Sequence, residues 1–145
     1  MKFVHWAVAA VLVGSVAGFI WPASADSSLP MDNPTTIDGV QTACTGIGSA
    51  QDDPQWKTWP IRVEFSNGGA QYLAGAHIVL SEGGKTKAAF DCAGSWVLFK
   101  LPTGSYKVTA NLTGQGGGAA RSATFSPPAS GQKRVVIQFP VQANQ

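Results

Sequence analysis

Apolar and polar residues alternate with a period of two along most of the chain from Val40 onward. In the clearest run, lysine, threonine and asparagine separate the apolar residues Tyr106, Val108, Ala110 and Leu112. A strand with this pattern buries one face and exposes the other to water. The alternation predicts β-strands near residues 39–47, 60–66, 75–81, 86–91, 95–101, 105–113, 119–125 and 133–139.

One predicted strand departs from this alternation. Residues 96–99 (Trp-Val-Leu-Phe) are all apolar, so this strand is predicted to lie centrally in a sheet with both faces covered. Turn sequences rich in glycine and proline separate the strands, and no segment after the N-terminal region has an apolar stripe of helical period. Seven or eight short strands at this spacing predict an all-β fold, an antiparallel β-sandwich. The predicted core consists of Ile61, Val63, Phe65, Ile78, Leu80, Trp96, Leu98, Tyr106, Val108, Ile137 and Phe139.

Residues 1–25 have the features of a signal peptide. Lys2 precedes an apolar run at residues 4–20, and Ala23-Ser24-Ala25 provides small residues at the cleavage positions. We expect cleavage before Asp26 and a periplasmic or secreted protein; an uncleaved membrane anchor is the alternative. Residues 26–38 contain two prolines and little hydrophobic pattern, which predicts a flexible leader or one loosely draped over the domain. The β-sandwich domain is expected at residues 39–140, followed by a C-terminal tail at 141–145.

The low net charge of the chain and the scatter of its charged residues bear on which partners it could bind. The formal net charge is only +2, and the charged residues are scattered without a basic stripe, so we expect no nucleic-acid partner. After signal cleavage no segment is long and apolar enough to form a transmembrane helix. The remaining chain is the size of one domain and is expected to be a monomer.

The chain contains two cysteines, Cys44 and Cys92. In an oxidising compartment an even number of cysteines favours a disulfide, so we predict a Cys44–Cys92 bond. Two free, buried thiols are the alternative.

Three short motifs imitate known chemistry and lack its other parts. The segment from Cys92 to Trp96 resembles a cysteine-protease nucleophile, but the only histidine after the signal peptide, His77, precedes it. Gly84-Lys85-Thr86 resembles the end of a phosphate-binding loop, yet the required earlier glycine is replaced by Val79. Residues 101–104 (Leu-Pro-Thr-Gly) resemble a shortened sorting signal and suit a tight turn. We therefore expect no catalytic residues and no enzyme.

Metal and cofactor sites are not expected either. One histidine and two paired cysteines do not make a typical zinc site. Asp52 and Asp53 form the only adjacent carboxylate pair, and we expect them to cap the loop around them, with calcium as the alternative.

Two tryptophans in one polar loop, Trp56 and Trp59, are the strongest candidates for a binding surface, with Tyr72 a weaker third. Exposed rings at these positions would stack on sugars or anchor a protein partner. Alternatively, the tryptophans fold over the end of the sandwich and cap its core.

The stretch from residue 73 to 139 resembles the carboxypeptidase regulatory-like domain, a family of the transthyretin-like sandwich group. The resemblance covers a little over half of the chain after the signal peptide. Residues 39–67, with Cys44, differ from the usual opening of the family and suggest an added strand held through Cys92. The residues that match the family pattern are Gly75, Ile78, Leu80, Asp91, Gly94, Trp96, Leu98, Leu101, Pro102, Gly104, Tyr106 and Val108.

The resemblance implies a non-catalytic module, here without a peptidase domain beside it. We therefore expect an exported binding or interaction module of the cell envelope, with an unknown envelope protein or glycan as partner and no cofactor. A protein partner would require an exposed apolar patch or an accessible sheet edge. The alternative is a carbohydrate-binding module that uses the Trp56/Trp59 loop, which would require at least one exposed ring among Trp56, Trp59 and Tyr72.

Overall fold

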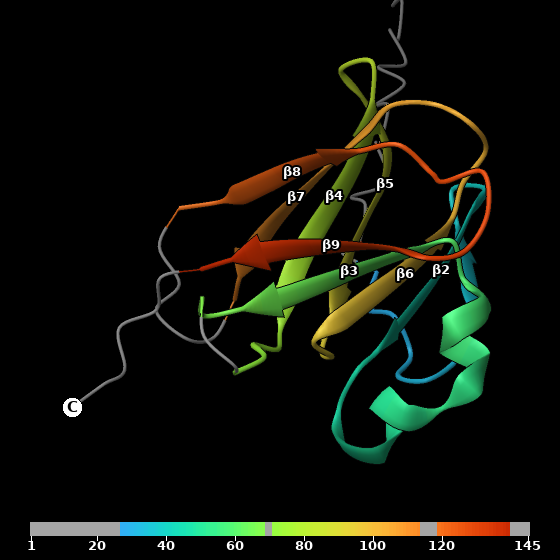
Figure 1. Cartoon of the computed structure of the whole chain (residues 1–145). Helices are drawn as coiled ribbons and strands as arrows, with labels where there is room; N and C mark the ends of the chain where they lie inside the picture. The colour runs from blue at the N-terminus through green and yellow to red at the C-terminus, as the bar shows by residue number, and fades with distance from the viewer. Residues whose placement is uncertain (1–26, 69–70, 114–118, 140–145) are drawn as a thin grey trace, which may run out of the picture.

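The chain folds into two facing β-sheets in a computed structural model that describes residues 27–68, 71–113 and 119–139 (Figure 1). Neighbouring strands are antiparallel except β3 and β9, which run parallel. The five-stranded sheet has the order β1 (Thr35–Ile37), β2 (Val40–Thr45), β6 (Trp96–Lys100), β3 (Ile61–Ser66), β9 (Lys133–Gln138). The four-stranded sheet has the order β5 (Lys85–Cys92), β4 (Ala76–Glu82), β7 (Tyr106–Leu112), β8 (Arg121–Phe125). The predicted β-sandwich and all eight predicted strands are confirmed.

The alternating pattern places one face of each strand between the sheets. In β7, residues 106, 108, 110 and 112 are buried and the residues between them are not. Because the hydrophobic effect scales with apolar area removed from water, these faces supply most of the folding free energy. The fully buried residues of this inter-sheet core include Ile61, Val63, Phe65, Ile78, Leu80, Phe90, Val97, Phe99 and Val108.

Strand β6 is central, as its continuous apolar sequence predicts, with β2 on one side and β3 on the other. Its two faces contribute to different parts of the molecule. Val97 and Phe99 point into the inter-sheet core, whereas Leu98 belongs to a separate buried cluster on the outer face of the five-stranded sheet. Trp96 and Leu98 are buried as predicted, but against outer-face neighbours instead of the second sheet.

Residues 27–38 of the predicted leader pack against the domain. Leu29 is 5% exposed, and its N–H donates to the carbonyl of Asp91 at 3.0 Å, so this segment lies along the end of β5. Six residues after Leu29, β1 begins and pairs with β2. Leu29, Met31 and Ile37 cover the core at irregular spacing, which explains why no period was visible in the sequence. The predicted signal peptide (1–25) and tail (141–145) lie outside the described residues.

Two short 3₁₀ helices, η1 (Gly48–Asp52) and η2 (Pro54–Thr58), connect β2 to β3. Asp53 caps η2, because its carboxylate accepts a hydrogen bond from the backbone N–H of Gln55 at 3.0 Å. That hydrogen bond lowers the pKa of Asp53. In the described residues, no helix has the length and apolar content needed to cross a bilayer.

The Leu-Pro-Thr-Gly sequence forms the predicted turn between β6 and β7. The hydroxyl of Tyr106 reaches back and donates to the carbonyl of Pro102 at 2.8 Å. A side chain at Gly104 would lie 2.7 Å from Oε2 of Glu82 and 3.3 Å from the Tyr106 ring. Gly104 and the following Tyr106 therefore have structural roles in this turn.

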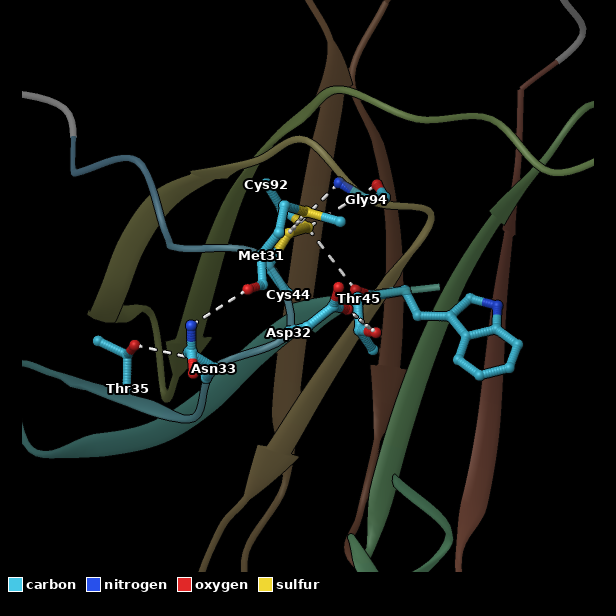
Figure 2. Close-up of a disulfide and its surroundings, with 9 residues drawn as sticks. Met31, Asp32, Asn33, Thr35, Cys44, Thr45, Cys92 and Gly94 are labelled. Atoms are coloured by element: carbon cyan, nitrogen blue, oxygen red, sulfur yellow. Dashed lines mark hydrogen bonds between the residues drawn. A yellow bond between two sulfur atoms is a disulfide. The ribbon is translucent and has the colours of Figure 1, made fainter. Parts of the chain in front are cut away.

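The predicted disulfide between Cys44 and Cys92 is present and joins the two sheets, because Cys44 lies in β2 and Cys92 ends β5 (Figure 2). The Cα atoms of the two cysteines are 5.6 Å apart. Around the bond, the N–H of Gly94 donates to Sγ of Cys44 at 3.3 Å, and the sulfur of Met31 lies 3.4 Å from the same atom. Both sulfur atoms are buried, and the leader covers one side of them.

Candidate functional site

The outer face of the five-stranded sheet carries an unusual group of side chains on three neighbouring strands. Because residues 61, 63 and 65 of β3 point into the core, Arg62 and Glu64 point outward. In the strand register, Arg62 lies between Leu98 of β6 and Arg134 of β9, and Glu64 lies between Trp96 and Val136. Two arginines and a glutamate, bordered by a tryptophan, therefore meet on one face.

Glu64 is completely buried and is held from three sides. Its Oε1 lies 3.2 Å from Nε of Arg62, an ion pair without hydrogen-bond alignment. Its Oε2 accepts a hydrogen bond from Nε of Arg134. The hydroxyl of Tyr72 donates to Oε1 at 3.3 Å. A buried carboxylate is tolerated only when it is paired and hydrogen-bonded, and these three groups provide that environment.

The two arginines remain partly open to solvent. The side chain of Arg62 is 22% exposed and that of Arg134 is 56% exposed, against 0% for Glu64. The hydrogen bond and the charge of Glu64 raise the pKa of Arg134, which keeps this guanidinium protonated. The site therefore presents two permanent positive charges above one buried negative charge.

Two aromatic rings fix the position of Arg62. Its guanidinium carbon lies 4.4 Å from the centre of the Trp96 ring, which is a cation–π contact. Tyr72 meets the same tryptophan edge-on, with ring centres 6.0 Å apart. Trp96 is 4% exposed, and its Nε1 has no hydrogen-bond partner. Gly46 lies against this ring, where a Cβ would be 2.6 Å from Cγ of Trp96.

Trp56 and Trp59, the candidates for a binding surface, are both buried, so the interpretation in which they cap the core applies to them. Trp56 is 1% exposed and Trp59 is 4% exposed, because η2 folds back onto the outer face of the sheet. The two indoles pack with Ala43 and Leu98 in a small second core. They therefore cap hydrophobic surface, as the alternative interpretation held, although on the sheet face and not at the end of the sandwich. Tyr72, the third predicted residue, is only partly buried and belongs to the Glu64 group.

An open depression of about 450 Å³ lies beside this second core. Lys100 stands at its border, with Nζ 4.6 Å from the centre of the Trp59 ring. The ammonium group covers the indole, so the depression does not give a flat ligand access to that face of the ring. Hydroxyl and amide groups dominate the remaining lining, which includes Thr35, Thr36, Gln41, Gln55 and Thr58.

The other residues considered in the sequence lie elsewhere. His77 projects from the outer face of the four-stranded sheet, and its Nδ1 is 2.7 Å from Oδ1 of Asp91. Asp52 ends η1, while Asp53 has the capping role that the sequence predicted. No group of three or more potential metal ligands occurs within residues 27–68, 71–113 and 119–139.

Sequence reasoning missed the Glu64 group. The alternation assigned Arg62 and Glu64 to the polar face of their strand, where charged residues are ordinarily solvated. Arg134 comes beside them only through the parallel pairing of β3 with β9, across about 70 intervening residues. One sequence feature could have indicated the group. Strand β6 is apolar on both faces and must be covered on both, so charged residues of an Arg-x-Glu pattern on a neighbouring strand could be buried.

The chain was compared with protein-family models and with curated proteins. No protein-family model matches the chain, and no curated protein aligns with it.

Proposed function

We propose that this protein is an exported, non-catalytic interaction module of the cell envelope, built on the carboxypeptidase regulatory-like fold, that binds a protein partner. The partner is proposed to dock on the outer face around Glu64, which we call the Glu64 face: Arg62, Glu64, Tyr72, Trp96, Arg134 and Val136.

The observation that supports this proposal is the composition and bracing of the Glu64 face. Arginine, tyrosine and tryptophan are the residue types most enriched at the centres of protein interfaces. Here two arginines are bound to one buried carboxylate, and Arg62 is also stacked on Trp96. Side chains that are already fixed lose less conformational entropy when a partner binds.

Two further features agree with this location. Val136, in register with Glu64, is one of two large apolar side chains exposed among the described residues, at 39%. It lies on β9, an edge strand of the five-stranded sheet. The Cys44–Cys92 disulfide is compatible with an oxidising compartment outside the cytoplasm, where the proposed partner would be met.

Site-specific photocross-linking tests the proposal. A photoreactive amino acid replaces Val136 in the native host, and the same amino acid replaces Thr124, which is exposed on β8 of the other sheet. We expect one discrete cross-linked protein from position 136, and none from position 124. The position-136 product should decrease when Arg134→Gln is added. Equal products from both positions, or no product from position 136 in folded protein, would overturn the proposal.

A further inference from the structure

The guanidinium groups of the Glu64 face have donors that Glu64 does not use. Each guanidinium has five N–H bonds in a planar fork. Both Arg62 and Arg134 contact Glu64 through Nε, the inner nitrogen. Tyr72 also interacts with the Arg134 guanidinium, but in the described part of the chain Glu64 contacts both arginines through Nε and leaves their terminal nitrogens to other partners. Nε of Arg62 is buried, so the 22% of this side chain that is exposed belongs to its other atoms.

The charges of this face do not balance. The outward residues of β2, β3, β6 and β9 include one acidic residue, Glu64, and three basic ones, Arg62, Lys100 and Arg134. One arginine would neutralise Glu64. The second arginine places another positive charge beside the first, because Arg134 of β9 is the register partner of Arg62 of β3. Like charges on paired strand positions destabilise a sheet when nothing compensates them. Glu64 therefore does not neutralise all of the positive charge on this face.

We propose that Arg62 and Arg134 together bind an oxyanion, a carboxylate or phosphate group carried by the ligand. Glu64 acts as the positioning residue, because it holds both guanidiniums by their inner nitrogens and leaves the outer ones for the ligand. Planar guanidinium forks match the paired oxygens of carboxylates and phosphates. This inference rests on the proposed function, since it names the chemical group that the Glu64 face recognises.

The structure also explains why arginine stands at both positions. The guanidinium carbon of Arg62 lies 4.4 Å from the centre of the Trp96 ring, which restrains the position of its fork. The hydrogen bond from Arg134 Nε to Glu64 fixes the second fork. A lysine would keep the charge and lose both the plane and the inner donor.

A titration followed by nuclear magnetic resonance tests the oxyanion site. Sodium phosphate and sodium succinate are added separately to the disulfide-bonded protein at constant ionic strength maintained with sodium chloride. We expect saturable shifts of the Trp96 indole N–H and of the Arg62 and Arg134 side-chain signals. The probe that saturates at the lower concentration distinguishes phosphate from carboxylate.

Three variants make the titration specific. Arg134→Gln should weaken binding about tenfold or more, because a charge-assisted pair is lost. Arg134→Lys should not restore the affinity of the native protein. Arg121→Gln makes the same change of charge at an exposed position on β8 and should leave the affinity unchanged. Since Arg134 is 56% exposed, its substitutions should leave the protein folded, which the dispersion of the amide signals verifies.

Each outcome decides between the two proposals. Non-saturating shifts that are equal in the native protein and in Arg134→Gln overturn the oxyanion site, as does equal weakening by Arg121→Gln. If the site fails in this way and cross-linking from position 136 persists, the Glu64 face binds its partner by other chemistry. If the anions saturate the site and no cross-link forms, the oxyanion site stands and the protein-partner proposal is overturned.

Discussion

Among the individual side chains, Tyr106 shows how one polar group is used in the core. The residue is 3% exposed, and its hydroxyl closes the turn after β6 by donating to Pro102. Burial is the largest cause that raises the pKa of Tyr106 above its ordinary value of 10.0, and the nearby Glu82 carboxylate adds to it. The folded protein therefore favours the protonated, neutral phenol.

This shift predicts a loss of stability in alkali. Above a pH of about 10 the unfolded state releases the phenol proton while the folded state retains it, so the free energy of unfolding falls as pH rises. Tyr106→Phe should flatten this alkaline decline. At neutral pH the same variant should cost about 1 kcal/mol, because the Pro102 carbonyl loses its donor. Urea unfolding at pH values of about 7 and about 11 measures both effects. Identical alkaline slopes for the two proteins would contradict the prediction.

At the scale of elements, η2 covers what would otherwise be an exposed apolar stripe. Strand β6 is apolar on both faces, and the second sheet covers only one of them. Trp56 and Trp59 cover the other by packing on Ala43 and Leu98. The side chain of Gln132 donates to the carbonyl of Trp56 at 2.7 Å, which connects η2 to the segment before β9. The short helices therefore belong to the fold and are not a mobile binding loop.

Removing the Trp56 side chain should strongly destabilise the protein. Trp56 is 1% exposed, and truncation of a buried aromatic residue to alanine costs about 3–5 kcal/mol. Trp56→Ala should lose this amount in urea unfolding. Lys57→Ala, on the exposed side of the same helix, should change stability by less than about 0.5 kcal/mol. A similar small effect of both substitutions would mean that η2 is dispensable.

The sequence predicts those elements whose period extends over several residues. Strands β4 and β7 follow an alternation and β6 a continuous apolar run, and the structure confirms these strands. The three-residue β1 and the 3₁₀ helices are too short to establish a period, so their packing depends on tertiary contacts. The Glu64 face could not be predicted from the sequence for a related reason. It depends on the order β6-β3-β9, and the alternation of a strand does not identify its neighbour.

For the molecule as a whole, the important relation is between the two sheets. The inter-sheet core packs between them, and the Cys44–Cys92 bond joins them covalently where the leader packs. The Glu64 face lies on the outer side of one sheet, whereas the disulfide lies between the sheets and touches this face at the backbone carbonyl of Trp96, 3.6 Å from Sγ of Cys92. Substitutions of the cysteines should therefore reduce stability without changing the chemistry of the proposed site, provided that the protein still folds.

Loss of the disulfide should lower the free energy of unfolding by about 4 kcal/mol, because the bond closes a loop with a sequence separation of 48 and restricts the unfolded chain. This is a large part of the 5–15 kcal/mol that is typical of a domain. The double variant Cys44→Ser/Cys92→Ser should unfold at a lower urea concentration than the native protein. The native protein should approach the variant when unfolding is measured with a thiol reductant, and the reductant should not affect the variant. Equal midpoints for the oxidised native protein and the variant would show that the inter-sheet core alone determines stability.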